Sequence, residues 1–217
     1  MSRMIPEQTL LAFDLDDTLL HETDYIRGVI RAIASEFNQL PIPEGIDIKK
    51  PYEIMERWAA GDTTVHARMV EIYRTAQGVS PFSSHLPDLL DKLKRQGYTL
   101  AVITDGFTLR QRAKLRLLGI ESLFDEIWIS EERCADKLSG QPFEVIMKRF
   151  PRLTHFVYIG DNPAKDFAPA RSHGWHTVML RATTENIHPQ SSGTPADITI
   201  DSLHSLTDSS LFSELYR

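Results

Sequence analysis

Residues Leu10–Leu20 read LLAFDLDDTLL, an apolar run followed directly by three acids and then by apolar residues again. The run at residues 10–13 is short and uninterrupted, which is typical of a buried β-strand. Asp14 therefore stands where this strand ends, and open parallel α/β sheets bind ligands at that edge. Crowded carboxylates repel one another unless a cation lies among them, so Asp14 and Asp16 indicate a divalent metal. A plain turn or a helix cap also uses Asp and Thr, so residues elsewhere have to decide between the two.

Apolar segments that resemble buried strands recur along the chain, and helix-like segments separate most of them. The expected strands are 10–13, 98–103, 127–129, 156–159, 175–180 and 198–200, and the later expected helices are 86–95, 108–118, 142–150 and 163–171. Alternating strands and helices place the strands in one parallel sheet. The sequence therefore predicts an α/β fold, a Rossmann-like parallel sheet flanked by helices.

The first two expected strands are separated by roughly eighty residues, far more than one crossover connection needs. Apolar residues recur there with helical spacing, first at 25–37 and then in two shorter segments. We therefore predict a small α-helical cap at 21–83, inserted into a core formed by 1–20 and 84–217. Lids commonly close over active sites, so the cap is expected to select the substrate. Its polar candidates, each also a common surface or packing residue, are Tyr25, Arg27, His66 and Arg68.

Composition restricts the compartment and the partners. The 217 residues carry a formal net charge of -6 and one cysteine, Cys134. One cysteine forms neither a disulfide within the chain nor a cysteine-based zinc site, which favours a reducing compartment. No apolar window is as long as a membrane span, no secretory signal precedes the acidic cluster, and the basic residues are scattered. We expect a cytoplasmic protein that binds neither nucleic acid nor membrane; the oligomeric state has no signature in the sequence.

The second expected strand ends in Thr104, Asp105 and Gly106. The Thr104 hydroxyl can donate a hydrogen bond, and the amides of Asp105 and Gly106 open toward a helix that begins near residue 108. Backbone donors at a helix start favour an anion, so a phosphate suits this place. An ordinary strand-to-helix turn uses the same residue types.

The fourth expected strand also ends in acids. Gly160 allows close approach, and the carboxylate of Asp161 can then share a cation with Asp14. Asp166, expected on the first turn of the next helix, supports the site. The Asn-Pro pair at 162–163 is explained as the cap and first residue of that helix.

Lys137 lies in the loop after the third expected strand. Its charge can balance the accumulated acids and hold a transferred phosphoryl group. A lone lysine is more often a solvated surface residue, so Lys137 ranks below the aspartates.

With these four elements in order, nearly the whole chain resembles the haloacid dehalogenase superfamily, in particular its phosphatases with a small helical (C1-type) cap. The four family motifs correspond to Asp14-Leu15-Asp16-Asp17-Thr18, to Thr104-Asp105-Gly106, to Lys137 and to residues 160–166. The loop after Lys137 departs from the family pattern, because Leu138 and Gly140 stand where prolines are common.

The resemblance implies a reaction and a metal. Asp14 would be the nucleophile that forms an aspartyl-phosphate, and Asp16 the general acid and base. Mg²⁺ would be held by Asp14, Asp161 and the backbone carbonyl of Asp16. The substrate would be a small phosphomonoester, such as a sugar phosphate, a nucleotide or a related metabolite.

The same resemblance implies supporting roles. Thr104 and Lys137 would bind the phosphoryl oxygens, with Asp105 and Gly106 beside them. Thr18 would steady the loop that carries the catalytic acids, and Asp17 would contribute only its backbone.

Several alternatives remain open at this point. A phosphomutase of the superfamily uses the same acids. A haloacid dehalogenase needs no acid at the position of Asp16, which makes it the weaker alternative. A non-enzymatic phosphoacceptor module of the receiver type also gathers aspartates, a lysine and Mg²⁺, but its chain is shorter and has no cap. A catalytically silent scaffold is a further alternative.

Overall fold

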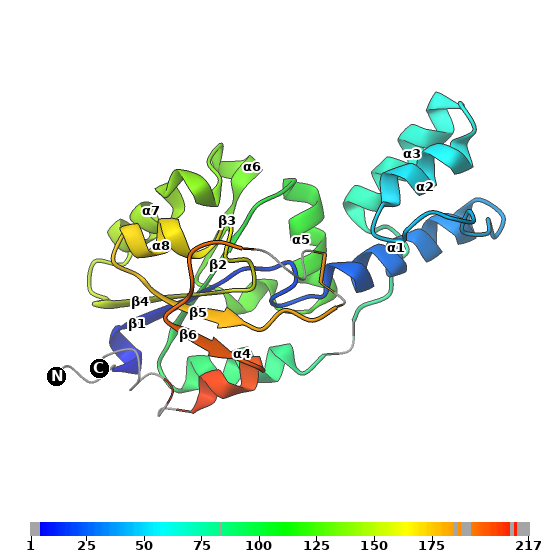
Figure 1. Cartoon of the computed structure of the whole chain (residues 1–217). Helices are drawn as coiled ribbons and strands as arrows, with labels where there is room; N and C mark the ends of the chain where they lie inside the picture. Colours follow the sequence, from blue (N-terminus) through cyan, green and yellow to red (C-terminus); the bar gives the residue numbers. More distant parts are fainter. Residues whose placement is uncertain (1–4, 83, 185, 188–191, 209–210, 212–217) are drawn as a thin grey trace.

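A six-stranded parallel β-sheet forms the centre of the molecule, in the order β3-β2-β1-β4-β5-β6 (Figure 1). The computed structural model describes residues 5–208 except 83, 185 and 188–191, together with residue 211. The strands are β1 (Thr9–Phe13), β2 (Thr99–Thr104), β3 (Glu126–Ile129), β4 (His155–Gly160), β5 (His176–Leu180) and β6 (Ile198–Ile200). All six expected strands and the Rossmann-like α/β fold are confirmed.

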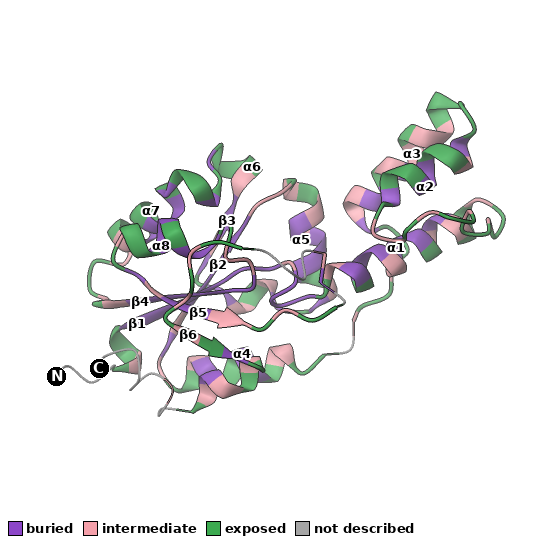
Figure 2. Ribbon diagram, in the orientation of Figure 1, coloured by how far each residue is buried: buried purple, intermediate pink, exposed green. Residues whose placement is uncertain are grey.

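Helices cover both faces of the sheet, so the central strands are buried on both sides (Figure 2). They are α4 (Leu86–Arg95) and α5 (Thr108–Leu117) on one face, and α7 (Gln141–Arg149) and α8 (Phe167–Ser172) on the other. In β1, Leu11 and Phe13 pack toward the first face, and Leu10 and Ala12 pack toward the second. Side chains alternate between the faces of a strand, so a doubly covered strand is apolar throughout, as the run at the start of the chain predicted.

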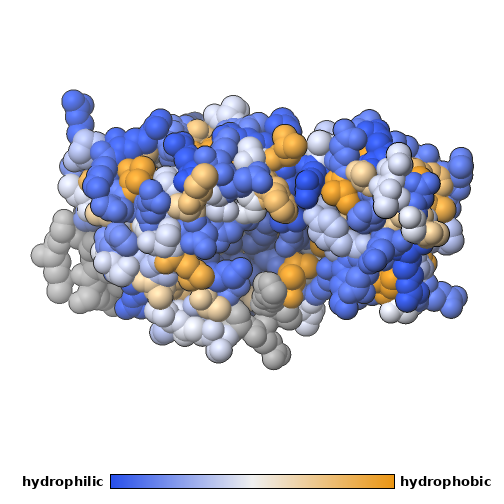
Figure 3. All heavy atoms as spheres, turned by 90° about the horizontal axis from the view of Figure 1, so that it is seen from above, coloured by the Kyte–Doolittle hydropathy of each residue, from blue (hydrophilic) through white to orange (hydrophobic). Residues whose placement is uncertain are grey.

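The shorter elements lie at the ends of the strands and helices. They are η1 (Pro6–Gln8), η2 (Glu121–Leu123), α6 (Ser130–Arg133), η3 (Lys137–Ser139) and η4 (Leu203–Thr207). Among the described residues, no helix combines the length and the apolar character needed to cross a bilayer. Seen from above, the apolar residues form several separate patches among hydrophilic ones (Figure 3).

The helix after β4 begins later than predicted. We expected it at 163–171 with Asn162 as its cap, but α8 begins at Phe167. The carbonyl of Asn162 accepts from the Asp166 amide at 3.0 Å, and its side chain accepts from the Ala164 amide at 3.1 Å. Asn162 therefore closes a tight turn instead of capping the helix, and Asp166 becomes the residue that precedes α8.

Three helices occupy the long segment between β1 and α4: α1 (Glu22–Glu36), α2 (Pro51–Ala59) and α3 (Thr63–Thr75). The amides of Thr64 and Val65 donate to the Asp62 carboxylate, which caps α3. The Tyr25 hydroxyl of α1 donates to the Tyr73 carbonyl of α3 at 2.6 Å. Figure 1 shows α1 leading away from the sheet, with α2 and α3 beside it. The division into a core and a cap at 21–83 stays a prediction.

Candidate active site

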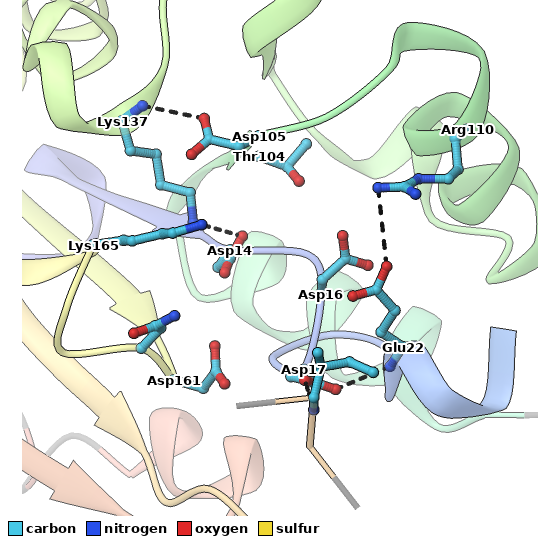
Figure 4. A pocket seen from close by; sticks show the side chains of 12 residues that line it. Asp14, Asp16, Asp17, Glu22, Thr104, Asp105, Arg110, Lys137, Asp161 and Lys165 are labelled. Carbon is cyan, nitrogen blue, oxygen red and sulfur yellow. Dashed lines mark hydrogen bonds and ion pairs between the residues drawn. The ribbon is translucent and has the colours of Figure 1, made fainter. Parts of the chain in front are cut away.

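A cavity of about 190 Å³ opens at the carboxyl ends of the strands (Figure 4). Asp14 follows β1 and Asp161 follows β4, the two strands between which the chain changes its direction of winding. Ligands bind at such a switch point in open α/β sheets. The cavity is lined by Asp14, Asp16, Asp17, Glu22, Thr104, Asp105, Arg110, Lys137, Asp161, Asn162, Lys165 and Ile187. The residues expected at three strand ends and in the Lys137 loop therefore meet in one place.

The carboxylate of Asp14 is buried and anchored. Its Oδ1 accepts from the Leu15 amide at 2.7 Å and lies 2.9 Å from Lys137 Nζ. Burial raises the pKa of Asp14 well above its ordinary value, and the nearby Lys137 opposes this shift without reversing it. Two partners on Oδ1 fix the orientation of this carboxylate, which suits a nucleophile that attacks along a defined direction.

Lys137 is buried, so it is not the solvated lysine of the alternative interpretation. Its Nζ lies 2.8 Å from Asp166 Oδ1 as well as beside Asp14. Burial opposes its charge, but the two carboxylates outweigh burial and raise the pKa of Lys137. Its amide donates to the Asp105 carboxylate at 3.1 Å, which fixes the loop although the prolines common in the family are missing.

Three buried carboxylates at this end fit a divalent cation. Asp14, Asp161 and Asp166 each bring one oxygen to within 4.8 Å of the others. Burial, and after it the neighbouring Asp166, raise the pKa of Asp161 to about 6. Hard divalent cations prefer oxygen ligands and relieve this kind of repulsion. Asp14 and Asp161 suit direct ligation, because both line the cavity, whereas Asp166 does not and binds Lys137 and the Asn162 amide behind them.

Gly160 is needed where β4 meets this cluster. A Cβ at this position would lie 2.5 Å from Asp166 Oδ2 and 3.2 Å from the Tyr158 ring. Asp166 also accepts from the Tyr158 hydroxyl at 3.3 Å. The close approach expected at Gly160 is thus between the strand and the buried Asp166 carboxylate.

Asp16 forms the other end of the cavity. Its Oδ1 lies 2.5 Å from Lys114 Nζ, and its Oδ2 accepts from Gln111 Nε2 at 3.0 Å. Burial works to raise the pKa of Asp16, but Lys114, Arg110 and Gln111 together outweigh burial and lower it. Lys114 also lies 3.3 Å from Glu22 Oε1. Asp16 is therefore held as an anion by a buried cation.

Thr104 ends β2, Gly106 follows it, and Thr18 lies in the first loop. The three residues differ in whether they reach the cavity and in their hydrogen-bond partners. Thr104 lines the cavity and accepts from Gln111 Nε2 at 2.6 Å, so its own hydroxyl hydrogen can serve a ligand. The Gly106 amide donates instead to Ser130 Oγ at 2.9 Å, and Gly106 is not among the lining residues, which argues against its expected role toward phosphate. The Thr18 hydroxyl is buried with no hydrogen-bond partner among the described residues, so it does not steady the loop through a hydrogen bond.

The Asp17 side chain does more than predicted. Its two oxygens accept from the Glu22 amide at 3.0 Å and from the Ile187 amide at 2.6 Å. Asp17 has a φ of 56°, an uncommon conformation for a residue other than glycine. The expectation that only its backbone matters was wrong: the carboxylate joins the first loop to the start of α1 and to the segment after β5.

The comparisons with known proteins agree with this geometry. The model of haloacid dehalogenase-like hydrolases matches residues 9–174. The chain belongs to this family. It is 27% identical over 220 residues to the glyceraldehyde 3-phosphate phosphatase of Methanocaldococcus jannaschii, across 91% of this chain and 95% of that protein. The ribulose-1,5-bisphosphate 5-phosphatase of Halopiger xanaduensis is 32% identical over 127 residues, 56% of this chain and 53% of that protein.

A solved structure supports the fold of this haloacid dehalogenase-like hydrolase. The HAD-hydrolase YfnB of Bacillus subtilis, in a structure bound to magnesium, superposes with a TM-score of 0.67 at 22% identity, across 91% of this chain and 96% of that one. The family resemblance predicted from the motifs is confirmed, and the receiver-type alternative is excluded.

Among the residues of the hydrolase's site that were not predicted, Glu22 and Arg110 line the cavity, and Gln111 and Lys114 contact Asp16 from behind that lining. Arg110, Gln111 and Lys114 share one helix, α5, where their spacing resembles an ordinary polar helix face. One signal was available, because Arg110 and Lys114 are four residues apart on a helix that starts directly after Thr104. That spacing places both on one side of α5, and the start of α5 lies at the functional edge of the sheet.

Proposed function

We propose that this enzyme, a phosphatase of small phosphomonoesters, works through an aspartyl-phosphate on Asp14 and uses Mg²⁺. The buried pair of Asp14 and Lys137 beside Asp161 carries the proposal, because it joins a nucleophile, a cation and the acids of a metal site at one strand edge. The names of the relatives, which are phosphatases of glyceraldehyde 3-phosphate and of ribulose-1,5-bisphosphate, support a small phosphorylated metabolite as the substrate.

The proposed reaction has two steps. An oxygen of Asp14 forms a bond to phosphorus while the bond from phosphorus to the ester oxygen breaks, and Asp16 gives its proton to the departing alkoxide. Asp16 then takes a proton from a water molecule, which attacks the aspartyl-phosphate and releases inorganic phosphate. Asp16 is an anion in the cavity, so the proton has to be acquired when the phosphate dianion enters and raises the pKa of Asp16.

Charge neutralisation is the remaining requirement. Thr104 and Lys137 line the side of the cavity that holds Asp14, where they can bind phosphoryl oxygens. Mg²⁺ bound by Asp14, Asp161 and the backbone carbonyl of Asp16, with Asp166 in support, would offset the repulsion between the phosphate and the nucleophile. Burial and the neighbouring Asp166 raise the pKa of Asp161, and a bound cation would offset both effects.

We further infer that α1, α2 and α3 act as the cap and that the enzyme works in the cytoplasm.

The cavity is smaller than the roughly 300–1,000 Å³ of pockets for drug-sized ligands, which favours a compact metabolite over a nucleotide. The four cap residues considered for specificity are not among the lining residues. Two of them, Arg27 and Arg68, pair with acids of the helical segment itself.

A panel of phosphorylated metabolites, assayed for released phosphate with and without Mg²⁺, tests the function. We expect Mg²⁺-dependent release, and Asp14→Asn is expected to lower it by about 10³-fold or more, because the nucleophile is removed. Asp91→Asn, an exposed acid on α4, is the matched control and is expected to retain full activity. Activity that survives in Asp14→Asn would refute the mechanism. Phosphoryl exchange between sugar positions without net release would indicate a phosphomutase.

A further inference from the structure

One buried cation of the cavity, Arg110, has no hydrogen-bond partner for its side chain among the described residues. Arg110 on α5 lies 4.0 Å from Glu22 Oε1, beyond hydrogen-bond range, and its guanidinium stands 5.9 Å from the centre of the Tyr73 ring. Its Nε is buried and has no partner among the described residues. The side chain is only 17% exposed, so water does not fully replace the missing partners.

The other buried cations of the site are satisfied. Lys137 lies within 3 Å of two carboxylates, and Lys114 contacts Asp16 and Glu22. Lys165 lines the cavity too but is exposed to water. A buried donor without an acceptor is destabilising, so native proteins rarely keep one without a reason. Arg110 is therefore the buried cation of the cavity that has capacity for a ligand.

The position of Arg110 would bring it into contact with the leaving group of the substrate. In Figure 4, Asp14 and Lys137 lie on one side of Asp16, and Arg110 and Glu22 lie on the other. If the phosphoryl group binds at Asp14 and the ester oxygen meets Asp16, the remainder of the substrate extends toward Arg110. The planar guanidinium fork matches a carboxylate or a phosphate in two parallel hydrogen bonds.

We propose that Arg110 binds a second anionic group, a carboxylate or a second phosphate, on the leaving part of the substrate. This rests on the proposed function for the orientation of the ester. Specificity then comes partly from α5 of the sheet domain and not from the inserted helices alone. Lys114 already neutralises part of the charge of Glu22, which limits the repulsion between Glu22 and the incoming anion.

Matched esters test the proposal: 3-phosphoglycerate for a carboxylate, fructose 1,6-bisphosphate for a second phosphate, and glycerol 3-phosphate with neither. We expect the wild-type enzyme to prefer at least one anionic ester, and Arg110→Gln to lose about tenfold to a hundredfold in kcat/KM on that ester. On glycerol 3-phosphate the variant should change less than about threefold. Which anionic ester responds distinguishes the carboxylate from the phosphate. Arg116→Gln, an exposed arginine on the same helix, is the matched control and should leave the preference intact.

A binding measurement separates this inference from the proposed function. Calorimetry on Asp14→Asn protein, with and without Arg110→Gln, measures affinity for the same three esters without turnover. Weaker binding of the anionic ester alone supports Arg110 even if the wild-type protein hydrolyses nothing, which would overturn only the proposed function. Equal losses of affinity on all three esters would overturn the proposal. Recovery of wild-type selectivity in the double variant Arg110→Gln with Glu22→Gln would also overturn it, because Arg110 would then serve only to neutralise Glu22.

Discussion

At each end of the active site a buried lysine bridges two carboxylates. Lys137 lies between Asp14 and Asp166, at 2.9 and 2.8 Å. Lys114 lies between Asp16 and Glu22, at 2.5 and 3.3 Å. We call these the Asp14 end and the Asp16 end. The arrangement is similar, but the surroundings differ in a way that separates their functions.

The difference lies in burial and in the number of acids. The side chains of Asp14 and Asp166 are 9% and 0% exposed, and Asp161 stands nearby as a third acid. Asp16 and Glu22 are 20% and 18% exposed. Burial is the largest influence on both acids. It prevails at the Asp14 end and raises the pKa of Asp14, whereas Lys114, Arg110 and Gln111 together outweigh it at the Asp16 end and lower the pKa of Asp16. The Asp14 end therefore has unneutralised acid to offer a metal, and the Asp16 end has little.

The largest effect is expected from Lys137→Met. This change leaves buried acids without their cation, so we expect the free energy of unfolding to fall by about 3–5 kcal/mol and phosphate release to fall by about 10²–10³-fold. Urea unfolding and the phosphate assay measure the two effects. Added Mg²⁺ should recover part of the stability but little of the activity. Lys148→Met is the matched control, because that lysine is 71% exposed and its partner in the described part of the chain is Glu144, which is exposed as well.

A smaller effect is expected from Lys114→Met. Water reaches the two acids that it pairs, so the unfolding free energy should fall by only about 1–3 kcal/mol. Without Lys114 the Asp16 side chain is no longer held in place. We expect kcat to fall about tenfold and KM to change little, because Asp16 acts in proton transfer and not in substrate binding. A loss of stability as large as that of Lys137→Met, or an unchanged kcat, would remove the distinction between the two ends.

The Asp14 end was largely predictable because its residues follow strands. A short apolar run with a polar residue after it marks a strand end, and parallel strands bring such ends to one edge. Asp14, Thr104 and Asp161 follow this rule. Lys137 was predicted from the same reasoning, although its burial was not, because burial depends on the packing of the loop.

The Asp16 end was not predictable in the same way. Lys114 lies on α5, a helix rich in basic residues, where a lysine normally faces solvent, and only the tertiary structure turns it inward against Asp16. Glu22 is an acid in the first turn of α1, a common position that carries no signal of a site. The late start of α8 was missed for a related reason: Asn162 has the sequence signal of a helix cap, but its carbonyl and side chain close a turn that directs Asp166 into the cluster.

The smallest expected effect is the stabilisation of the protein by Mg²⁺, compared at two pH values. It tests directly whether the Asp14 end has more unneutralised acid than the Asp16 end. In the folded protein the pKa of Asp161 is raised to about 6 from an ordinary value of 3.8, so protonation favours folding. The stability of the metal-free protein should therefore fall as the pH rises from about 4 through 6. Mg²⁺ binds the ionised acids, so a concentration of about ten times Kd should raise Tm by about 3–5 °C at pH 7.5 and by much less at pH 5.

Two variants assign that pH dependence to one end of the cavity. Asp161→Asn removes a metal ligand and a titrating group of the Asp14 end, so it should abolish most of the Mg²⁺ shift at pH 7.5. Glu22→Gln changes the Asp16 end, where Lys114 already supplies the positive charge, and should leave the shift intact. Two results would contradict this expectation: an equal Mg²⁺ shift of Tm at both pH values, or a shift that depends on Glu22 as much as on Asp161. Either would mean that both ends attract the cation and that burial does not separate their roles.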